Sequence, residues 1–124
     1  HKVILNENLI IDGGSSPDYG GSVSNINPEQ KLAAAVSSCF MMTFLALAAK
    51  MKWPVKNYKD KAISYLGKNN EGRMYVNKIE LNPQIIFDND FTISDDEMHK
   101  MKERSHKYCF IANSLSKDVE IKIN

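Results

Sequence analysis

The sequence predicts an α+β domain in which a long, almost uncharged helix packs on an antiparallel sheet. Three observations lead to this prediction. Residues 32–49 contain no charged side chain, Ser94 begins a helix-capping motif that ends at Glu97, and residues 119–123 alternate between apolar and charged side chains. Together, a long apolar helix, an amphipathic helix and alternating strands favour helices segregated against a sheet.

The central helix is predicted over residues 27–53. Asn27 serves as the N-cap, Pro28 takes the first helical position, and Glu29 places an acidic side chain in the first turn. A helix that is apolar on nearly every face is either wholly buried or in a membrane. We expect burial, because the segment is rich in alanine, carries three hydroxyl side chains, and is the only large apolar partner for the remaining chain.

Strands are expected on both sides of this helix. The segments with strand-like composition, each next to turn-forming residues, are residues 3–11, 55–66 and 73–87. The first is interrupted by polar residues and predicts a hairpin or two short strands, followed by a glycine-rich loop. Pro54 is expected to end the central helix. Pro83, inside the third segment, predicts a bulge or an edge position.

A second helix is predicted over residues 94–108, beginning with the capping box of Ser94 and Glu97. Met98 and Met101 lie on one face of it, which we assign to the core. Residues 119–123 then form the last strand.

Composition narrows the function classes. The 124 residues form one domain, residues 1–124, with a net charge of +1. No basic stripe with interleaved aromatic residues is present, so nucleic acid is not expected as a partner. A membrane is not expected either, because the central apolar segment is rich in alanine and hydroxyl side chains. Two distant cysteines do not make a disulfide scaffold, which favours a reducing cytoplasm. Because the chain starts at His1 rather than methionine, we expect an upstream segment to be missing.

Size predicts an oligomer. The central helix of roughly 24 residues would be about 36 Å long, whereas a domain of this size has a radius of gyration of about 14 Å. One domain cannot enclose such a helix alone. We therefore predict an obligate homodimer in which a second copy covers the faces of the helix that remain exposed.

Two cysteine motifs carry a resemblance to a known family. Asn27 to Gln30 precede Cys39 and Phe40 in the alanine-rich helix, and the second motif is Ser-His-Lys-Tyr-Cys-Phe around Cys109. From about residue 25 to the C-terminus the chain resembles the OsmC/Ohr family of thiol-dependent peroxidases. The resemblance implies an intertwined homodimer that reduces organic hydroperoxides in oxidative or osmotic stress defence. It also implies that no cofactor is needed and that an external dithiol, such as a lipoyl group, is the reductant.

The same resemblance assigns the site residues. Cys39 matches the peroxidatic cysteine, Cys109 the resolving cysteine, and Glu29 the active-site glutamate. The four side chains that we expect to line an apolar peroxide pocket are Phe40, Met41, Met42 and Phe44. On one helix Glu29 and Cys39 are about 15 Å apart, so Glu29 is expected to reach the cysteine pair of the partner subunit.

One family feature is absent from the sequence. The family holds its thiolate with an arginine on an early Gly-Gly-Arg loop, but Ser15 follows Gly13 and Gly14, and the first arginine is Arg73. Two explanations are open: the arginine lies upstream of His1, which the non-methionine start favours, or this member has lost it. The question matters because lowering a thiol pKa from about 8.5 to 6 requires roughly 3.4 kcal/mol of stabilisation.

Other readings of the same residues remain. A cysteine in an apolar helix is commonly an inert small hydrophobe, and a glutamate in a first helical turn is commonly a surface acid. A relative on the same scaffold could bind a ligand or sense redox state without turnover. His106, three residues before Cys109, could bind a metal with the cysteines, but one histidine and two cysteines make a poor zinc set. We therefore treat His106 as structural and predict no metal.

Overall fold

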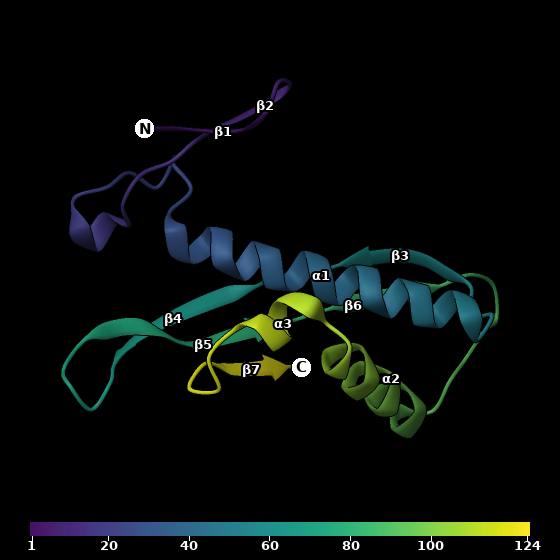
Figure 1. The fold of residues 1–124 in the computed structure, drawn as a ribbon. Coiled ribbons are helices and arrows are strands. Elements are labelled where there is room, and N and C mark those ends of the chain that lie inside the picture. The colour runs from purple at the N-terminus through teal and green to yellow at the C-terminus, as the bar shows by residue number, and fades with distance from the viewer.

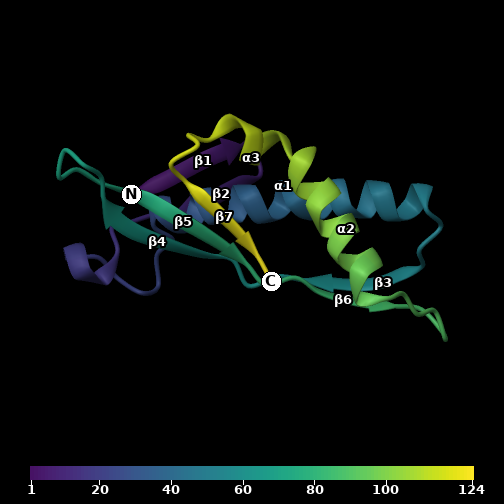
Figure 2. The same cartoon turned by 90° about the horizontal axis from the view of Figure 1, so that it is seen from below.

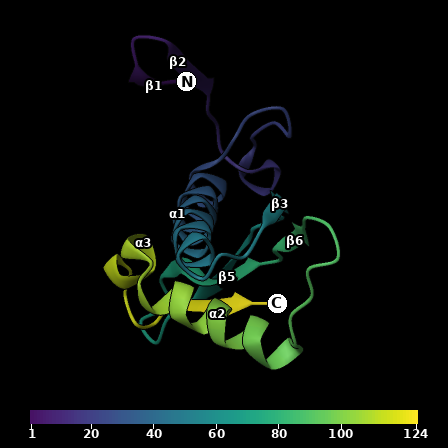
Figure 3. The same ribbon diagram turned by 90° about the vertical axis from the view of Figure 1, so that its right-hand side faces the viewer.

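Helix α1 (Pro28–Lys50) runs along the length of the molecule, and most other elements pack around it (Figure 1). The computed structural model describes residues 1–124. Viewed end-on, α1 lies between α3 on one side and β3 and β6 on the other, with α2 beneath (Figure 3). The other elements, in chain order, are β1 (Lys2–Asn6), β2 (Leu9–Asp12), η1 (Pro17–Tyr19), β3 (Val55–Lys59), β4 (Ile63–Lys68), β5 (Met74–Leu81), β6 (Gln84–Phe87), α2 (Asp95–Lys107), α3 (Phe110–Ser114) and β7 (Glu120–Ile123).

The strands form three small sheets. β1 pairs with β2, and β3 pairs with β6, both antiparallel. The third sheet has the order β4-β5-β7, in which β4 and β5 are antiparallel but β7 is parallel to β5 (Figure 2). The prediction of an antiparallel sheet therefore fails at β7. The chain reaches β7 through α2 and α3, and a crossover of this length permits parallel pairing.

Two predicted strands are each divided in two by a corner. The segment 55–66 splits into β3 and β4, and the segment 73–87 splits into β5 and β6, with Pro83 in the second break. Asp60 joins the two corners to α1, because its carboxylate accepts hydrogen bonds from the Asn82 N–H at 2.6 Å and from the Ser37 hydroxyl at 2.5 Å. The hydrogen bond from Asn82 to Asp60 holds the two corners side by side where both strands pass between the β3–β6 sheet and the β4–β5–β7 sheet.

Both ends of α1 are closed by local capping motifs, but only the first is visible in the sequence. Asn27 is the N-cap, and its side chain and that of Gln30 form a capping box. The C-terminus lies before Pro54: Lys52 adopts a left-handed conformation with φ 57°, and the Trp53 N–H donates to the Ala48 carbonyl at 2.9 Å. This is a Schellman motif, which usually contains glycine. Because lysine stands at the left-handed position, the end at Lys50 gave no sequence signal, and the predicted end at Trp53 is wrong.

Only one stripe of α1 is buried within the chain. The five buried residues are Ala33, Val36, Phe40, Phe44 and Ala48. They pack against Ile79, Leu81 and Cys109 in one cluster and Met101 in another. The prediction that a single chain cannot enclose this helix is confirmed, and burial of its remaining faces by a second copy stays a prediction. By length and composition α1 could also cross a membrane, but a stripe packed on sheet and helix is typical of a core helix.

The β1–β2 hairpin stands away from the other elements (Figure 1). Its apolar side chains are largely exposed, and Ile4 reaches 72% exposure.

The second helix follows the prediction closely, since Ser94 caps α2 through a capping box with Glu97.

Candidate active site

Cys39 lies in the middle of α1, next to the buried stripe. It is half-buried and packs against the cluster that contains Val36, Phe40 and Cys109. Its position on the edge of the stripe leaves the sulfur between the protein core and solvent. A nucleophilic thiol needs protein groups that set its pKa and a side from which substrate can approach. This position provides both.

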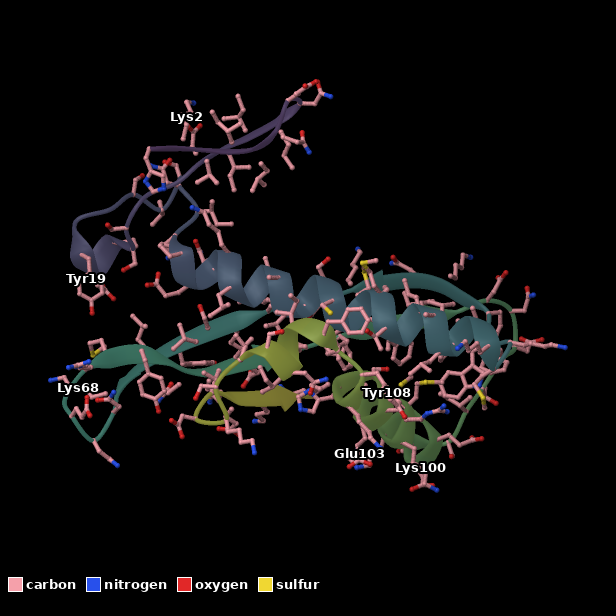
Figure 4. The ribbon with its side chains drawn as sticks, in the orientation of Figure 1. Lys2, Tyr19, Lys68, Lys100, Glu103 and Tyr108 are labelled. Atoms are coloured by element: carbon pink, nitrogen blue, oxygen red, sulfur yellow. The ribbon has the colours of Figure 1, made fainter.

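Cys109 is placed by a break between two helices. α2 ends at Lys107, Tyr108 is its C-cap, and Cys109 then becomes the N-cap of α3. The Cys109 sulfur accepts a hydrogen bond from the Ala112 N–H at 3.5 Å, and the residue is fully buried. Figure 4 shows Tyr108 at this junction between α2 and α3. α3 packs on α1, which brings the two cysteines together.

The surroundings of Cys39 favour its thiolate. Burial raises the pKa of Cys39, but four donors lower it by more: the Ile111 N–H, the Cys109 S–H, the Phe110 N–H and the Thr43 hydroxyl. The net result is a lowered pKa for Cys39. All four donors are neutral, so within this chain the thiolate is stabilised by hydrogen bonds rather than by a cation.

The two thiols are differentiated by their environments. Burial raises the pKa of Cys109, and the adjacent Cys39 raises it further, against the Ala112 N–H, which lowers it. Neither arginine of the chain belongs to this group. Arg73 lies between β4 and β5 and pairs with Glu71, and Arg104 is exposed on α2. The environment therefore favours the thiolate of Cys39 and the protonated thiol of Cys109.

An apolar cavity of about 580 Å³ opens beside Cys39. The residues that line it are Ala35, Ser38, Cys39, Met42, Thr43, Ala46, Tyr108, Phe110 and Ile111. Met42 and Phe110 are 65% and 81% exposed and form its rim. The cavity suits a ligand with an apolar body.

Glu29 lines a different, larger cavity of about 880 Å³ between the first half of α1 and β3–β4. Met41 lines that second cavity too. Within a single chain, therefore, neither Glu29 nor Met41 lines the cavity beside Cys39. Phe40 and Phe44 are fully buried in the core and line neither cavity. Of the four expected pocket residues, only Met42 lines the cavity beside Cys39.

Selective alkylation tests the two pKa directions. At pH 7.5 we expect iodoacetamide to label Cys39 before Cys109, because the pKa of Cys39 is lowered and that of Cys109 is raised. The rate of Cys39 labelling against pH, followed by peptide mass spectrometry, should reach its midpoint below that of free cysteine. Preferential labelling of Cys109, or a Cys39 midpoint at or above the free-cysteine value, would contradict this.

Sequence reasoning missed several groups in the site. Thr43 follows Cys39 by one helical turn, a spacing that could have identified it. The N–H groups of Phe110 and Ile111 gave no comparable signal, because α3 is short and begins at a cysteine, which is not a usual N-cap residue.

Comparison with known proteins identifies the family and the fold of the chain. The profile of the OsmC-like protein family matches residues 20–124. An OsmC-like protein of unknown function from Vibrio cholerae is similar in structure, with 36% identity and a TM-score of 0.84 over 94% of this chain and 78% of its own. No curated protein sequence matches significantly.

Two more distant structures carry functional names. The organic hydroperoxide resistance protein OsmC from Legionella pneumophila has 21% identity and a TM-score of 0.76, over 94% of this chain and 80% of its own. The organic hydroperoxide resistance protein OhrB of Bacillus subtilis has 16% identity and a TM-score of 0.72, over 94% of this chain and 82% of its own. At these identities the likeness shows the fold.

Proposed function

Because the chain belongs to the OsmC-like protein family, we propose that it is a two-cysteine thiol peroxidase that reduces organic hydroperoxides to alcohols. The observation that supports this most directly is a pair of free thiols packed in one cluster, with Cys39 opening onto an apolar cavity. Their pKa values are shifted in opposite directions, as a nucleophile and a resolving thiol require.

The first step is attack of the Cys39 thiolate on the terminal oxygen of the hydroperoxide. The S–O bond forms as the O–O bond breaks, and the alkoxide leaves with the electron pair and takes a proton to become the alcohol. Cys39 is oxidised to a sulfenic acid, and the peroxide is reduced by two electrons.

The second step uses Cys109. Its sulfur attacks the sulfenic sulfur of Cys39, a disulfide forms, and the sulfenic oxygen leaves as water with the Cys109 proton. An external dithiol, for example a lipoyl group, then reduces the disulfide and is itself oxidised to a disulfide. Because the cycle starts and ends with two free thiols, we assign the protein to the cytoplasm.

The cavity supports a bulky apolar hydroperoxide rather than hydrogen peroxide. Met42, Ala46, Phe110 and Ile111 offer carbon surface to the organic group, whereas Cys39 and Thr43 provide the polar end. Burial of the organic group contributes roughly 25 cal/mol per Å² of apolar area, a contribution that hydrogen peroxide cannot make.

A homodimer forms part of the proposal. α1 presents an exposed stripe of small and apolar residues, which are Ala34, Ala35, Ser38, Met42, Ala46 and Ala49. The protruding β1–β2 hairpin adds exposed side chains such as Ile4 and Ile10. Isolated two-stranded hairpins are marginally stable in water. A second copy that packs on α1 and the hairpin would cover both surfaces.

The dimer also gives Glu29 a role. If α1 crosses its two-fold mate antiparallel at Ala34, halfway between Glu29 and Cys39, each Glu29 faces the cysteine of the partner subunit. Side chains near this crossing are small, which lets helix axes approach to about 8 Å. A carboxylate disfavours an adjacent thiolate, so we assign Glu29 to the hydroxyl of the bound hydroperoxide, as a hydrogen-bond acceptor.

Anaerobic titration with cumene hydroperoxide tests the proposed function. One equivalent of peroxide should convert two thiols into a Cys39–Cys109 disulfide, counted by mass spectrometry, with one equivalent of alcohol released. Cys109→Ser should instead stop at a Cys39 sulfenic acid that dimedone traps.

Two controls define the outcome. Cys39→Ser should neither consume peroxide nor form a disulfide. If both wild-type thiols persist in excess peroxide, the peroxidase proposal is wrong, and a ligand-binding or redox-sensing role on the same scaffold takes its place.

A further inference from the structure

The hydroxyl of Thr43 occupies a distinctive position beside Cys39. Thr43 follows Cys39 by one turn of α1, and both residues line the apolar cavity. The Thr43 Oγ1 donates a hydrogen bond to the Cys39 carbonyl at 2.9 Å. At this i, i+4 spacing the two side chains are neighbours on the same face of α1, so the same hydroxyl can turn toward the Cys39 sulfur. One proton can therefore be directed at either of two acceptors on the same residue.

We propose that Thr43 is a positioning residue for Cys39, whose hydroxyl turns from the Cys39 carbonyl to the Cys39 sulfur when the thiol ionises. This inference rests on the proposed function for its catalytic meaning, because a stabilised thiolate is what attacks the peroxide. Thr43 acts through Cys39 and makes no covalent bond.

The exchange leaves no polar group without a partner. In an α-helix the N–H of residue i donates to the carbonyl of residue i−4, so the Thr43 N–H already serves the Cys39 carbonyl. The hydroxyl is a second donor to that carbonyl and can leave it. Helical threonine also populates two χ1 rotamers because its hydroxyl can bond to the preceding turn. The turn of the hydroxyl thus needs no backbone movement.

The Thr43 hydroxyl is one of only two side-chain donors that favour the Cys39 thiolate. Burial disfavours the Cys39 thiolate, and the donors that oppose burial are all neutral. Among them the Thr43 hydroxyl and the Cys109 S–H are the only side-chain donors. Cys109 gives up its proton in the resolving step. Thr43 is therefore the side-chain donor that persists through the cycle.

Substitutions at Thr43 separate its hydroxyl from its shape. Thr43→Val keeps the branched shape without the hydroxyl, Thr43→Ala removes both, and Thr43→Ser keeps the hydroxyl. Ser105→Ala is the matched control, because the Ser105 hydroxyl makes the same type of bond, to the Met101 carbonyl at 2.7 Å, within α2.

The measurement is the rate of iodoacetamide alkylation of Cys39 against pH, read by peptide mass spectrometry on the reduced protein. For Thr43→Val and Thr43→Ala the midpoint should rise by about one pH unit, which lowers the thiolate population roughly tenfold at pH values well below the midpoint. Thr43→Ser and Ser105→Ala should keep the wild-type midpoint. Two hydroxyl-free variants ensure that poor folding of one does not remove the test.

The outcomes separate this inference from the peroxidase proposal. Wild-type midpoints in Thr43→Val and Thr43→Ala would overturn the role of Thr43, even if peroxide is reduced. A raised midpoint in Thr43→Ser would overturn it too, since the hydroxyl would not be the determinant. A shift confined to the two hydroxyl-free variants supports the inference, even in a protein that leaves cumene hydroperoxide untouched.

Discussion

An equimolar mixture of Glu29→Ala and Cys39→Ser subunits is expected to recover about one quarter of the wild-type peroxidase activity after subunit exchange. Each variant alone should be nearly inactive: Cys39→Ser lacks the nucleophile, and Glu29→Ala lacks the acceptor that positions the hydroperoxide, where misplacement of a reacting group can cost about 10² in rate. In the mixed dimer one site combines an intact Cys39 with the intact Glu29 of the other subunit. Random exchange makes half of all dimers mixed dimers. Each mixed dimer has one working site out of two, so one quarter of all sites are active.

The arrangement of the two cavities motivates this expectation. Glu29 and Cys39 line different cavities of one chain, so a shared site has to be formed between subunits. The measurement is cumene hydroperoxide consumption before and after exchange under mild denaturant and refolding. A mixture of Cys39→Ser and Cys109→Ser subunits is the control, because it undergoes the same subunit exchange but contains no Glu29 substitution. Absence of any recovery despite mixed dimers detected by native mass spectrometry would place Glu29 outside the site of its partner.

Phe44→Ala is expected to lower the free energy of unfolding by about 3–5 kcal/mol, the usual cost of truncating a buried phenylalanine. Phe44 is fully buried, and its ring contacts those of Phe40, Trp53 and Tyr58 at centroid distances of 6.5, 6.4 and 5.9 Å. The truncation leaves a cavity where α1 packs on β3. Urea unfolding should show a lower midpoint with an unchanged m-value.

Phe110→Ala is the matched control, because the same atoms are removed from a side chain that is 81% exposed. Its effect on the free energy of unfolding should be a small fraction of that of Phe44→Ala. Equal losses in the two variants would mean that Phe44 does not have the core position described here.

Much of the fold follows from local signals in the sequence. Asn27 and Ser94 each begin a helix because their side chains satisfy free N–H groups, a short-range effect that sequence reveals directly. The end of α1 was missed because tertiary packing of Trp53 holds Lys52 in a conformation that lysine does not usually adopt. The parallel placement of β7 depends on a crossover through α2 and α3, which no local pattern encodes.

The same contrast applies to the site. Cys39 and Cys109 could be identified because cysteine is rare here and both motifs are specific. The pocket lining could not, because α1 is apolar on every face and gives no periodicity that separates Phe40, which is buried, from Met42, which lines the cavity. Which face of such a helix is inside depends on residues distant in the sequence, such as Ile79 and Leu81.

The protruding β1–β2 hairpin has a consequence for how the protein is made. Within residues 1–124 the hairpin is a two-stranded sheet that exposes Ile4 and Ile10, and open sheet edges with apolar side chains favour aggregation. In the proposed dimer that exposure ends only when two chains meet. Folding then becomes a second-order process, and stability rises with protein concentration. Dilution would thus lower both the apparent stability of the dimer and the rate at which a new chain finds its partner.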